Sequence, residues 1–251
     1  WCPSRTPALN PALSPGVNGV RFLNGASLRI ENCHISNFRA ATAGNGNGVM
    51  VDASAAGTYR LQILDSTIVN NGVGNDGGGV RLRPTGANTF VFADIRNSDI
   101  SNNNGYGVLS RDRTFVTVTG SNISSNTRSG VNLTTTGTIG ETVVSDSTLT
   151  DNASVNVGSE AGVLSNGAAS FIHIAGNSIS QSETALRRLN SGHINSAGDN
   201  RSLGKGETGG TTAVPVFVEI AKSMNLPSKP FPRPAHVVAV AVDDPPRRVG
   251  V

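Results

Sequence analysis

Residues 97–109, with the sequence NSDISNNNGYGVL, carry the pattern that decides the fold. The stretch joins a short apolar strand centred on Ile100, a polar corner rich in Asn and Gly, and a second apolar strand that opens with Gly107-Val108. The same pattern recurs along most of the chain at irregular intervals. A constant core with loops of variable length is typical of a solenoid, in which each coil buries its apolar face against its neighbours.

Extending the pattern in both directions gives two columns of aliphatic residues. The first contains the central residue of the short strand: Ile35, Ile68, Ile100, Ile123, Leu149 and Ile179. The second contains the Val that follows Gly: Val49, Val80, Val108, Val131 and Val163. Between them lies a third segment, such as Leu28-Arg29-Ile30, in which apolar residues sit two apart. This is the period of a strand with one buried face, so we expect three strands per coil.

The polar corners contain an Asn at a constant offset of three residues after the first column. The members are Asn71, Asn103, Asn126 and Asn152. Asn tolerates the left-handed region, and its amide can bond to the same residue one coil away, so we predict a stacked ladder. The alternative is polar loop filler. The Gly before each column Val, such as Gly48 and Gly79, indicates either a positive φ or a close approach of backbone.

The motifs Gly-Val-x-Leu, x-Ile-x-Asn-Ser and Ile-Ser-x-Asn resemble the right-handed parallel β-helix repeat of the pectate-lyase-like superfamily, from about residue 17 to about residue 200. The resemblance implies an all-β fold: a single-stranded right-handed parallel β-helix (solenoid) of about seven three-strand coils, with a Pro-rich C-terminal tail. A leucine-rich repeat fits badly, because the units vary in length and lack a helical half. The superfamily includes lyases, hydrolases, epimerases and proteins with no assigned reaction, so the resemblance does not decide the function.

The repeat also divides the chain. We expect an irregular lead-in over residues 1–16, the β-helix over 17–203, a linker with a cap over 204–226, and a disordered Pro-rich tail over 227–251. Because the chain begins with Trp1, we expect a fragment or processed form whose signal peptide lies upstream. No apolar run approaches the length of a membrane span. Few cysteines and few lysines favour a bacterial secreted or cell-surface protein.

No group of residues indicates a catalytic or metal site. Glycoside hydrolysis needs two carboxylates roughly 5–10 Å apart, yet each predicted outward column holds a single carboxylate or acids several coils apart. The resemblance implies a calcium site with an arginine base, and only Asp52 beside Arg83 is similar to such a site. We favour the interpretation that these two residues form a surface ion pair. The histidines are scattered, and the two cysteines lack metal-ligand spacing. We expect no catalytic residues, no metal and no cofactor.

The remaining candidate is a basic and apolar strip on the outward side of the Gly-Val strands: Arg21, Met50, Arg81, Arg83, Leu109, Arg111 and Arg113. Arg81, Arg83, Arg111 and Arg113, with Asp52, are the predicted glycan-binding residues, because Arg side chains bind carboxylates well and suit an acidic polysaccharide. The alternative is an ordinary solvated face. A net charge of +3 gives no concentrated basic stripe, so nucleic acid is not expected as a partner.

Two functions follow. The first is a non-catalytic secreted or surface β-helix protein that acts as a rigid scaffold or polysaccharide-binding module. The alternative is a polysaccharide-active enzyme, either a pectate-lyase-like lyase or a glycoside hydrolase, whose catalytic residues the patterns above do not identify. The sequence leaves the oligomeric state open.

Overall fold

The computed structural model describes residues 17–39, 46–73, 77–154 and 159–203. The lead-in expected over 1–16, and the linker, cap and tail expected after residue 203, lie outside the described residues. All regular structure in the described part is β-strand, numbered β1 to β21. Within these ranges there is no helix long and apolar enough to cross a membrane.

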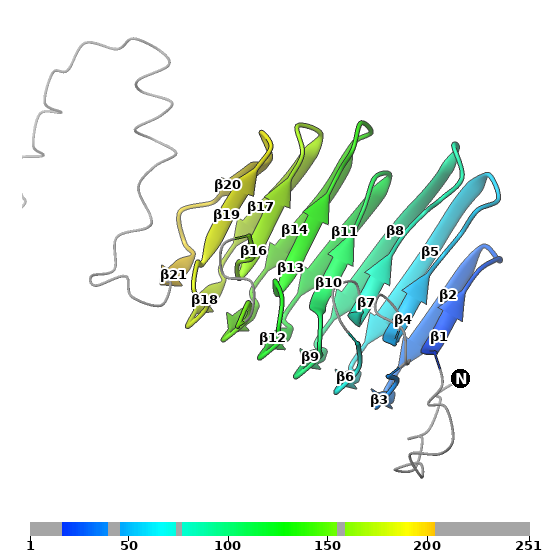
Figure 1. The fold of residues 1–251 in the computed structure, drawn as a ribbon, viewed down its shortest axis with the longest axis horizontal. Helices are drawn as coiled ribbons and strands as arrows, with labels where there is room; N and C mark the ends of the chain where they lie inside the picture. The colour runs from blue at the N-terminus through cyan, green and yellow to red at the C-terminus, as the bar shows by residue number, and fades with distance from the viewer. Residues whose placement is uncertain (1–16, 40–45, 74–76, 155–158, 204–251) are drawn as a thin grey trace, which may run out of the picture. The chain divides into compact units, whose positions relative to one another are not determined.

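The strands form three parallel sheets of seven strands each, because every coil gives one strand to each sheet (Figure 1). Sheet A contains β1 (Asn18–Phe22), β4 (Asn47–Val51), β7 (Gly78–Leu82), β10 (Tyr106–Ser110), β13 (Val131–Thr134), β16 (Val163–Asn166) and β19 (Leu186–Leu189). Sheet B contains β2 (Ser27–Glu31), β5 (Gly57–Leu64), β8 (Thr89–Arg96), β11 (Thr114–Thr119), β14 (Gly140–Ser145), β17 (Ser170–Ala175) and β20 (His193–Ser196). Sheet C contains β3 (His34–Ser36), β6 (Thr67–Val69), β9 (Asp99–Ser101), β12 (Asn122–Ser124), β15 (Thr148–Thr150), β18 (Ser178–Ser180) and β21 (Arg201–Leu203).

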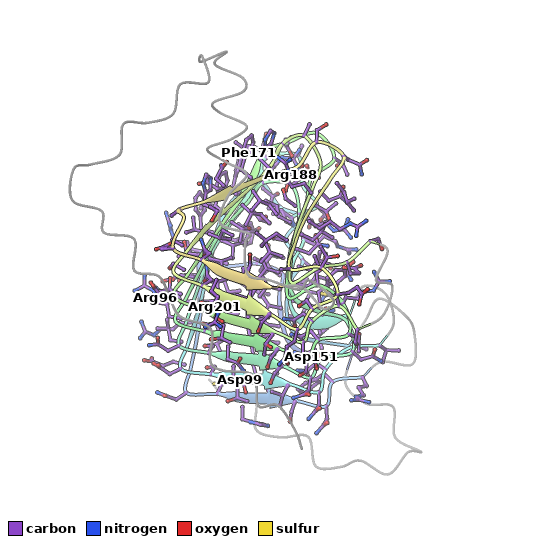
Figure 2. The ribbon with its side chains drawn as sticks, turned by 90° about the vertical axis from the view of Figure 1, so that its left-hand side faces the viewer. Arg96, Asp99, Asp151, Phe171, Arg188 and Arg201 are labelled. Carbon is purple, nitrogen blue, oxygen red and sulfur yellow. The ribbon has the colours of Figure 1, made fainter. Side chains whose placement is uncertain are left out.

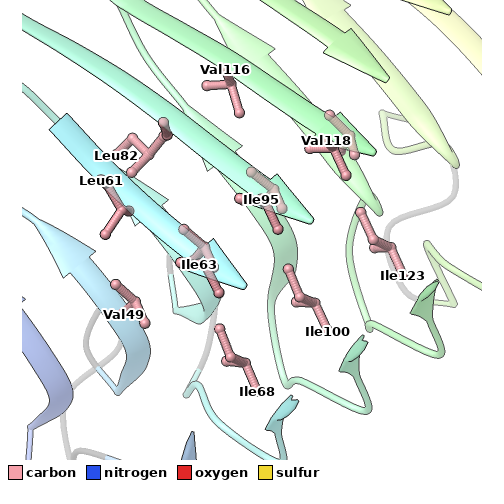
Figure 3. Close-up of a cluster of buried hydrophobic side chains, with 14 of the residues drawn as sticks. Val49, Leu61, Ile63, Ile68, Leu82, Ile95, Ile100, Val116, Val118 and Ile123 are labelled. Atoms are coloured by element: carbon pink, nitrogen blue, oxygen red, sulfur yellow. The ribbon is translucent and has the colours of Figure 1, made fainter. Parts of the chain in front are cut away.

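The predicted columns form the core of the solenoid. Ile68, Ile100 and Ile123 pair in register along sheet C and are fully buried. Val49 and Val80 pair in the same way along sheet A, and side chains from sheet B such as Ile95 complete the interior (Figure 3). The all-β parallel solenoid expected from the repeat is therefore confirmed.

The Gly that directly precedes each column Val on sheet A is required by close packing and not by a positive φ. A Cβ on Gly48 would lie 2.4 Å from Cγ2 of Ile68, and one on Gly79 would lie 2.4 Å from Cγ2 of Ile100. Each Gly therefore makes room for the Ile that closes the same coil. Of the two explanations offered by the sequence, close approach is the correct one.

The Asn residues at the corner after sheet C stack into a ladder. Asn103 Nδ2 donates to Asn126 Oδ1 at 3.0 Å and to the Ile68 carbonyl at 3.1 Å, and the Asn103 backbone N–H donates to the same Asn126 Oδ1. Asn71 and Asn152 continue the ladder in both directions. All four amides are buried, so each satisfies backbone groups that water cannot reach.

The left-handed residues at this corner are the neighbours of the ladder, such as Asn70 (φ 57°) and Asn102 (φ 54°), and not the ladder Asn residues themselves. Tolerance of a positive φ therefore explains why Asn occurs at the position directly before the ladder, and not why it occurs in the ladder. The prediction that the ladder Asn residues themselves adopt the left-handed region is wrong by one residue.

A second column, of Ser residues, stabilises the corner between sheets B and C and was not predicted. The hydroxyl of Ser98 accepts from the backbone N–H of Ser66 and donates to the Arg96 carbonyl. Ser121 and Ser147 repeat this arrangement. Cys33 occupies the first position of the same column and is buried.

Candidate functional site

The predicted arginine strip is divided in the structure. Met50, Arg81 and Leu109 pair in register on sheet A, and all three are buried, with Arg81 only 5% exposed. The expectation that these residues form an exposed strip is therefore wrong for this row. Arg83 and Arg111 directly follow β7 and β10, and Arg113 lies in the turn before β11 with φ 58°.

Asp52 binds two of the arginines of this region. Its Oδ2 lies 2.6 Å from Arg21 Nη2, and its Oδ1 lies 3.1 Å from Arg83 Nη2. The predicted pairing of Asp52 with Arg83 is thus present, with Arg21 as an additional partner. Burial alone would raise the pKa of Asp52, but the hydrogen bonds from Arg21 and Arg83 outweigh it and hold the pKa below its usual value. The charge of Arg83, one of the four predicted glycan-binding arginines, is therefore partly offset by Asp52.

The lowered pKa of Asp52 predicts a pH dependence of stability. Because the carboxylate is favoured in the folded state, its contribution is present above the unfolded pKa of about 3.9 and is lost as the pH falls through the lower folded value. We expect Asp52→Asn to lower the melting temperature at neutral pH and to have a diminishing effect below about pH 4. Thermal melting by circular dichroism across this range measures the difference. A difference that is constant with pH would contradict the ion-pair explanation.

A buried carboxylate lies at the start of the sheet A strands. Glu160 Oε1 accepts from Arg128 Nη1 at 2.6 Å and from the Tyr106 hydroxyl at 3.2 Å, and its Oε2 accepts from the backbone N–H and the hydroxyl of Ser129. The Glu160 side chain is 3% exposed. Burial, and then the charge of Glu160, raises the pKa of Tyr106. Both carboxylate oxygens are saturated with donors, so this cluster is a structural tie between three coils.

A groove of about 760 Å³ lies along the outer face of sheet B. Its lining comes from β2, β5, β8, β11 and β14, which are successive neighbours in the sheet. Neighbouring strands are about 4.8 Å apart, so the groove extends about 19 Å along the solenoid. Its lining combines aromatic and hydrogen-bonding side chains.

An aromatic pair lies at the centre of the groove. Phe92 and Phe115 pair in register and stack with ring centroids 5.0 Å apart and an interplanar angle of 15°. Arg60 lies on the preceding strand, and its guanidinium is 5.4 Å from the centre of the Phe92 ring. Glu141 follows Phe115 on the next strand. One row of the sheet therefore presents a cation, two aromatic rings and a carboxylate at successive coils.

The other charged residues of the groove are paired along their own strands. Arg29 binds both oxygens of Glu31 at 2.9 Å, and Arg96 Nε lies 2.8 Å from Asp94 Oδ1. Gln62 and Thr117 add neutral hydrogen-bonding side chains to the lining. Counting Glu31 with its partner, three arginines face three carboxylates, so the groove has no formal net charge.

The same face continues toward β20. Phe171 stacks on His193 with ring centroids 4.7 Å apart, and His173 Nε2 lies 3.5 Å from Glu141 Oε1. Figure 2 views the coils from the β20 end, with Phe171 and Arg96 marking the outer side of sheet B. The outer face of sheet B thus has aromatic residues on both sides of Glu141.

The carboxylates in the groove are poorly placed for glycoside hydrolysis. Asp94 and Glu141 lie on β8 and β14, which are separated by β11. Two strand spacings and an offset of two residues along the strands separate their backbones by about 12 Å, which exceeds the roughly 5–5.5 Å of a retaining pair and the 6.5–9.5 Å of an inverting pair. Asp94 is also held by Arg96. Among the described residues, no three His, Cys, Asp or Glu side chains come together as metal ligands.

The groove was not predicted from the sequence. The outward residues of sheet B change from coil to coil, as in Arg60, Phe92, Phe115 and Glu141, and show no repeat. Their alignment depends on the register of strands separated by turns of unequal length. The one available signal was the alternation within each strand, which places Phe92 and Phe115 on the outward side.

Comparison with known proteins agrees with the geometry. A model of the right-handed β-helix region matches residues 14–201, which is most of the chain. No curated protein gives a significant match, and no solved structure does. The chain therefore belongs to the right-handed β-helix family.

Proposed function

We propose that this protein is a non-catalytic, secreted or cell-surface β-helix module that binds a polysaccharide in the groove on the outer face of sheet B. The observation that carries the proposal is the row of Arg60, Phe92, Phe115 and Glu141 at the centre of that groove. Aromatic side chains offer apolar contact area to sugar C–H groups, while guanidinium and carboxylate groups bond to pairs of hydroxyls. A rigid sheet holds these groups at a fixed spacing, which lowers the entropic cost of binding an extended chain.

The groove is better suited to this role than the predicted arginine strip on sheet A. Arg81 is buried within the strip, and Arg21 and Arg83 are both bonded to Asp52. The groove instead presents its aromatic pair and its polar side chains on one open surface. An acidic polysaccharide bound beside Arg83, Arg111 and Arg113 remains the competing proposal.

The double variant Phe92→Ala with Phe115→Ala tests the groove directly. We expect it to weaken glycan binding by on the order of tenfold or more, because the central apolar contact is lost. Affinity electrophoresis over a panel of soluble polysaccharides, followed by calorimetry, measures the loss. Phe90→Ala is the matched control, because Phe90 is equally exposed at 38%, lies on the same strand as Phe92, and does not line the groove. Equal losses in both variants, or none in the double variant, would contradict the proposal.

The enzymatic alternative has one favourable observation, since two carboxylates line the groove. The same preparation should be assayed for release of reducing ends and of unsaturated uronates from pectin, polygalacturonate and alginate. We expect no turnover above background, because Asp94 and Glu141, the two carboxylates of the groove lining, lie two strands apart and Asp94 is bonded to Arg96. Turnover that disappears in Glu141→Gln would establish the enzyme instead.

A further inference from the structure

We infer that the ligand of the sheet B groove is an uncharged, extended glycan whose chain runs along the solenoid axis. This inference rests on the proposed glycan-binding function and specifies its ligand class. It differs from the acidic ligand that the sequence suggested, because the charges that line the groove are balanced and mostly paired.

The charge of the groove is internally neutralised. Arg29 is bonded at two positions to Glu31, and Arg96 is bonded to Asp94. A uronate chain would have to compete with these carboxylates for the guanidinium groups, and it would also approach Asp94 and Glu141, which repel it. Sugar hydroxyls avoid this conflict, since one hydroxyl can donate to a carboxylate and accept from a guanidinium.

The direction of the glycan chain follows from the row of side chains at the centre of the groove. Arg60, Phe92, Phe115 and Glu141 lie on four successive strands and are aligned in register across them. A glycan parallel to the solenoid axis meets the cation, both rings and the carboxylate in turn. A glycan parallel to the strands would meet only one of these groups at a time. The full row is therefore used only by an axial chain.

The length of the groove sets the length dependence of binding. Its lining spans five strands, or about 19 Å at about 4.8 Å per strand. Affinity should therefore rise with the number of sugar units until the oligosaccharide spans this distance, and then remain constant. A monosaccharide cannot contact Arg60 and Glu141 together, because the two positions are three strands apart.

The test uses calorimetry with neutral chains (xylan, mannan and mixed-linkage β-glucan, with their oligosaccharides) and acidic chains (polygalacturonate and alginate). We expect at least one neutral chain to bind, with affinity that changes less than about twofold between about 0.05 and 0.5 M salt, because no net charge is neutralised. Arg60→Gln should weaken this binding several-fold. Glu141→Gln should weaken it or leave it unchanged. Phe90→Ala should behave as the wild type.

An acidic ligand in the same groove gives the opposite signature. Arg60→Gln would again weaken binding, but Glu141→Gln would strengthen it by removing a repulsive charge, and added salt would weaken the wild type. That result would overturn this inference and leave the glycan-binding function intact. Binding that is lost in Arg83→Ser with Arg113→Ser, and not in Phe92→Ala, would move the site to sheet A. No binding of any neutral or acidic chain, or concentration-dependent dimerisation through Phe92, would overturn the glycan-binding function as well.

Discussion

The variant Ile100→Asp should not fold into the solenoid at neutral pH. Ile100 is fully buried, is stacked between Ile68 and Ile123, and packs against the backbone of Gly79. A carboxylate here has no counter-charge in the column. We therefore expect the free energy of unfolding to fall by more than about 4–5 kcal/mol, which few single substitutions reach. Because each coil depends on its neighbours, the loss should spread beyond the mutated coil.

Circular dichroism and differential scanning calorimetry measure this effect. Ile100→Val is the matched control, since it removes one methylene from the same column and should cost about 0.5–1.5 kcal/mol. A melting temperature for Ile100→Asp close to that of Ile100→Val would show that the column is not the core of the fold.

Among the acidic residues beside sheet A and in the sheet B groove, Glu160 should be the one whose replacement by Gln lowers stability most. The Glu160 carboxylate is buried and faces the guanidinium of Arg128, whose side chain is 13% exposed. Breaking a buried ion pair by removing one charge typically costs about 3–5 kcal/mol, since the other charge stays in a poorly solvated place. Tyr106 and Ser129 also donate to this carboxylate, so the loss should affect three coils together.

Glu31→Gln is the appropriate control, because Glu31 forms an exposed ion pair with Arg29 and its replacement should change stability little. The double variant Glu160→Gln with Arg128→Gln should recover part of the loss if the buried charge is the cause. Denaturant unfolding of the wild type, Glu160→Gln, Arg128→Gln and the double variant completes the cycle. Equal effects of Glu160→Gln and Glu31→Gln would show that Glu160 is only a surface charge.

The sequence predicts the fold well because the fold depends on residues that recur. The offset between Ile100 and Asn103 is the same in every coil that carries the ladder, so a contact between coils appears as a repeat within one chain. The column of Ser98 is as regular as the Asn ladder, yet it was not predicted. Ser also occurs throughout the loops, and the role of Ser98 depends on the backbone of the neighbouring coil.

The candidate site was not predictable in the same way. Phe92 and Phe115 belong to different coils, and their stacking requires the strand register that only the structure gives. Arg81 looks like an outward residue from strand alternation, yet it is buried, because alternation shows which way a side chain points and not what covers it. Tyr106 and Glu160 are 54 residues apart and carry no shared motif.

The side-chain columns at the corners make the whole coil the natural unit of evolutionary change. The Asn103 side chain accepts a hydrogen bond from the backbone N–H of Asn71, and the Asn126 side chain does the same for Asn103. The Ser121 hydroxyl likewise accepts from the backbone N–H of Ser98. A duplication or excision that begins and ends at equivalent positions recreates every corner contact with the new neighbour. The groove of sheet B lacks this interchangeability, because excising the coil that carries Phe115 would place Phe92 beside Glu141. A lineage can thus lengthen or shorten its solenoid while keeping the Asn and Ser ladders and rewriting its binding face.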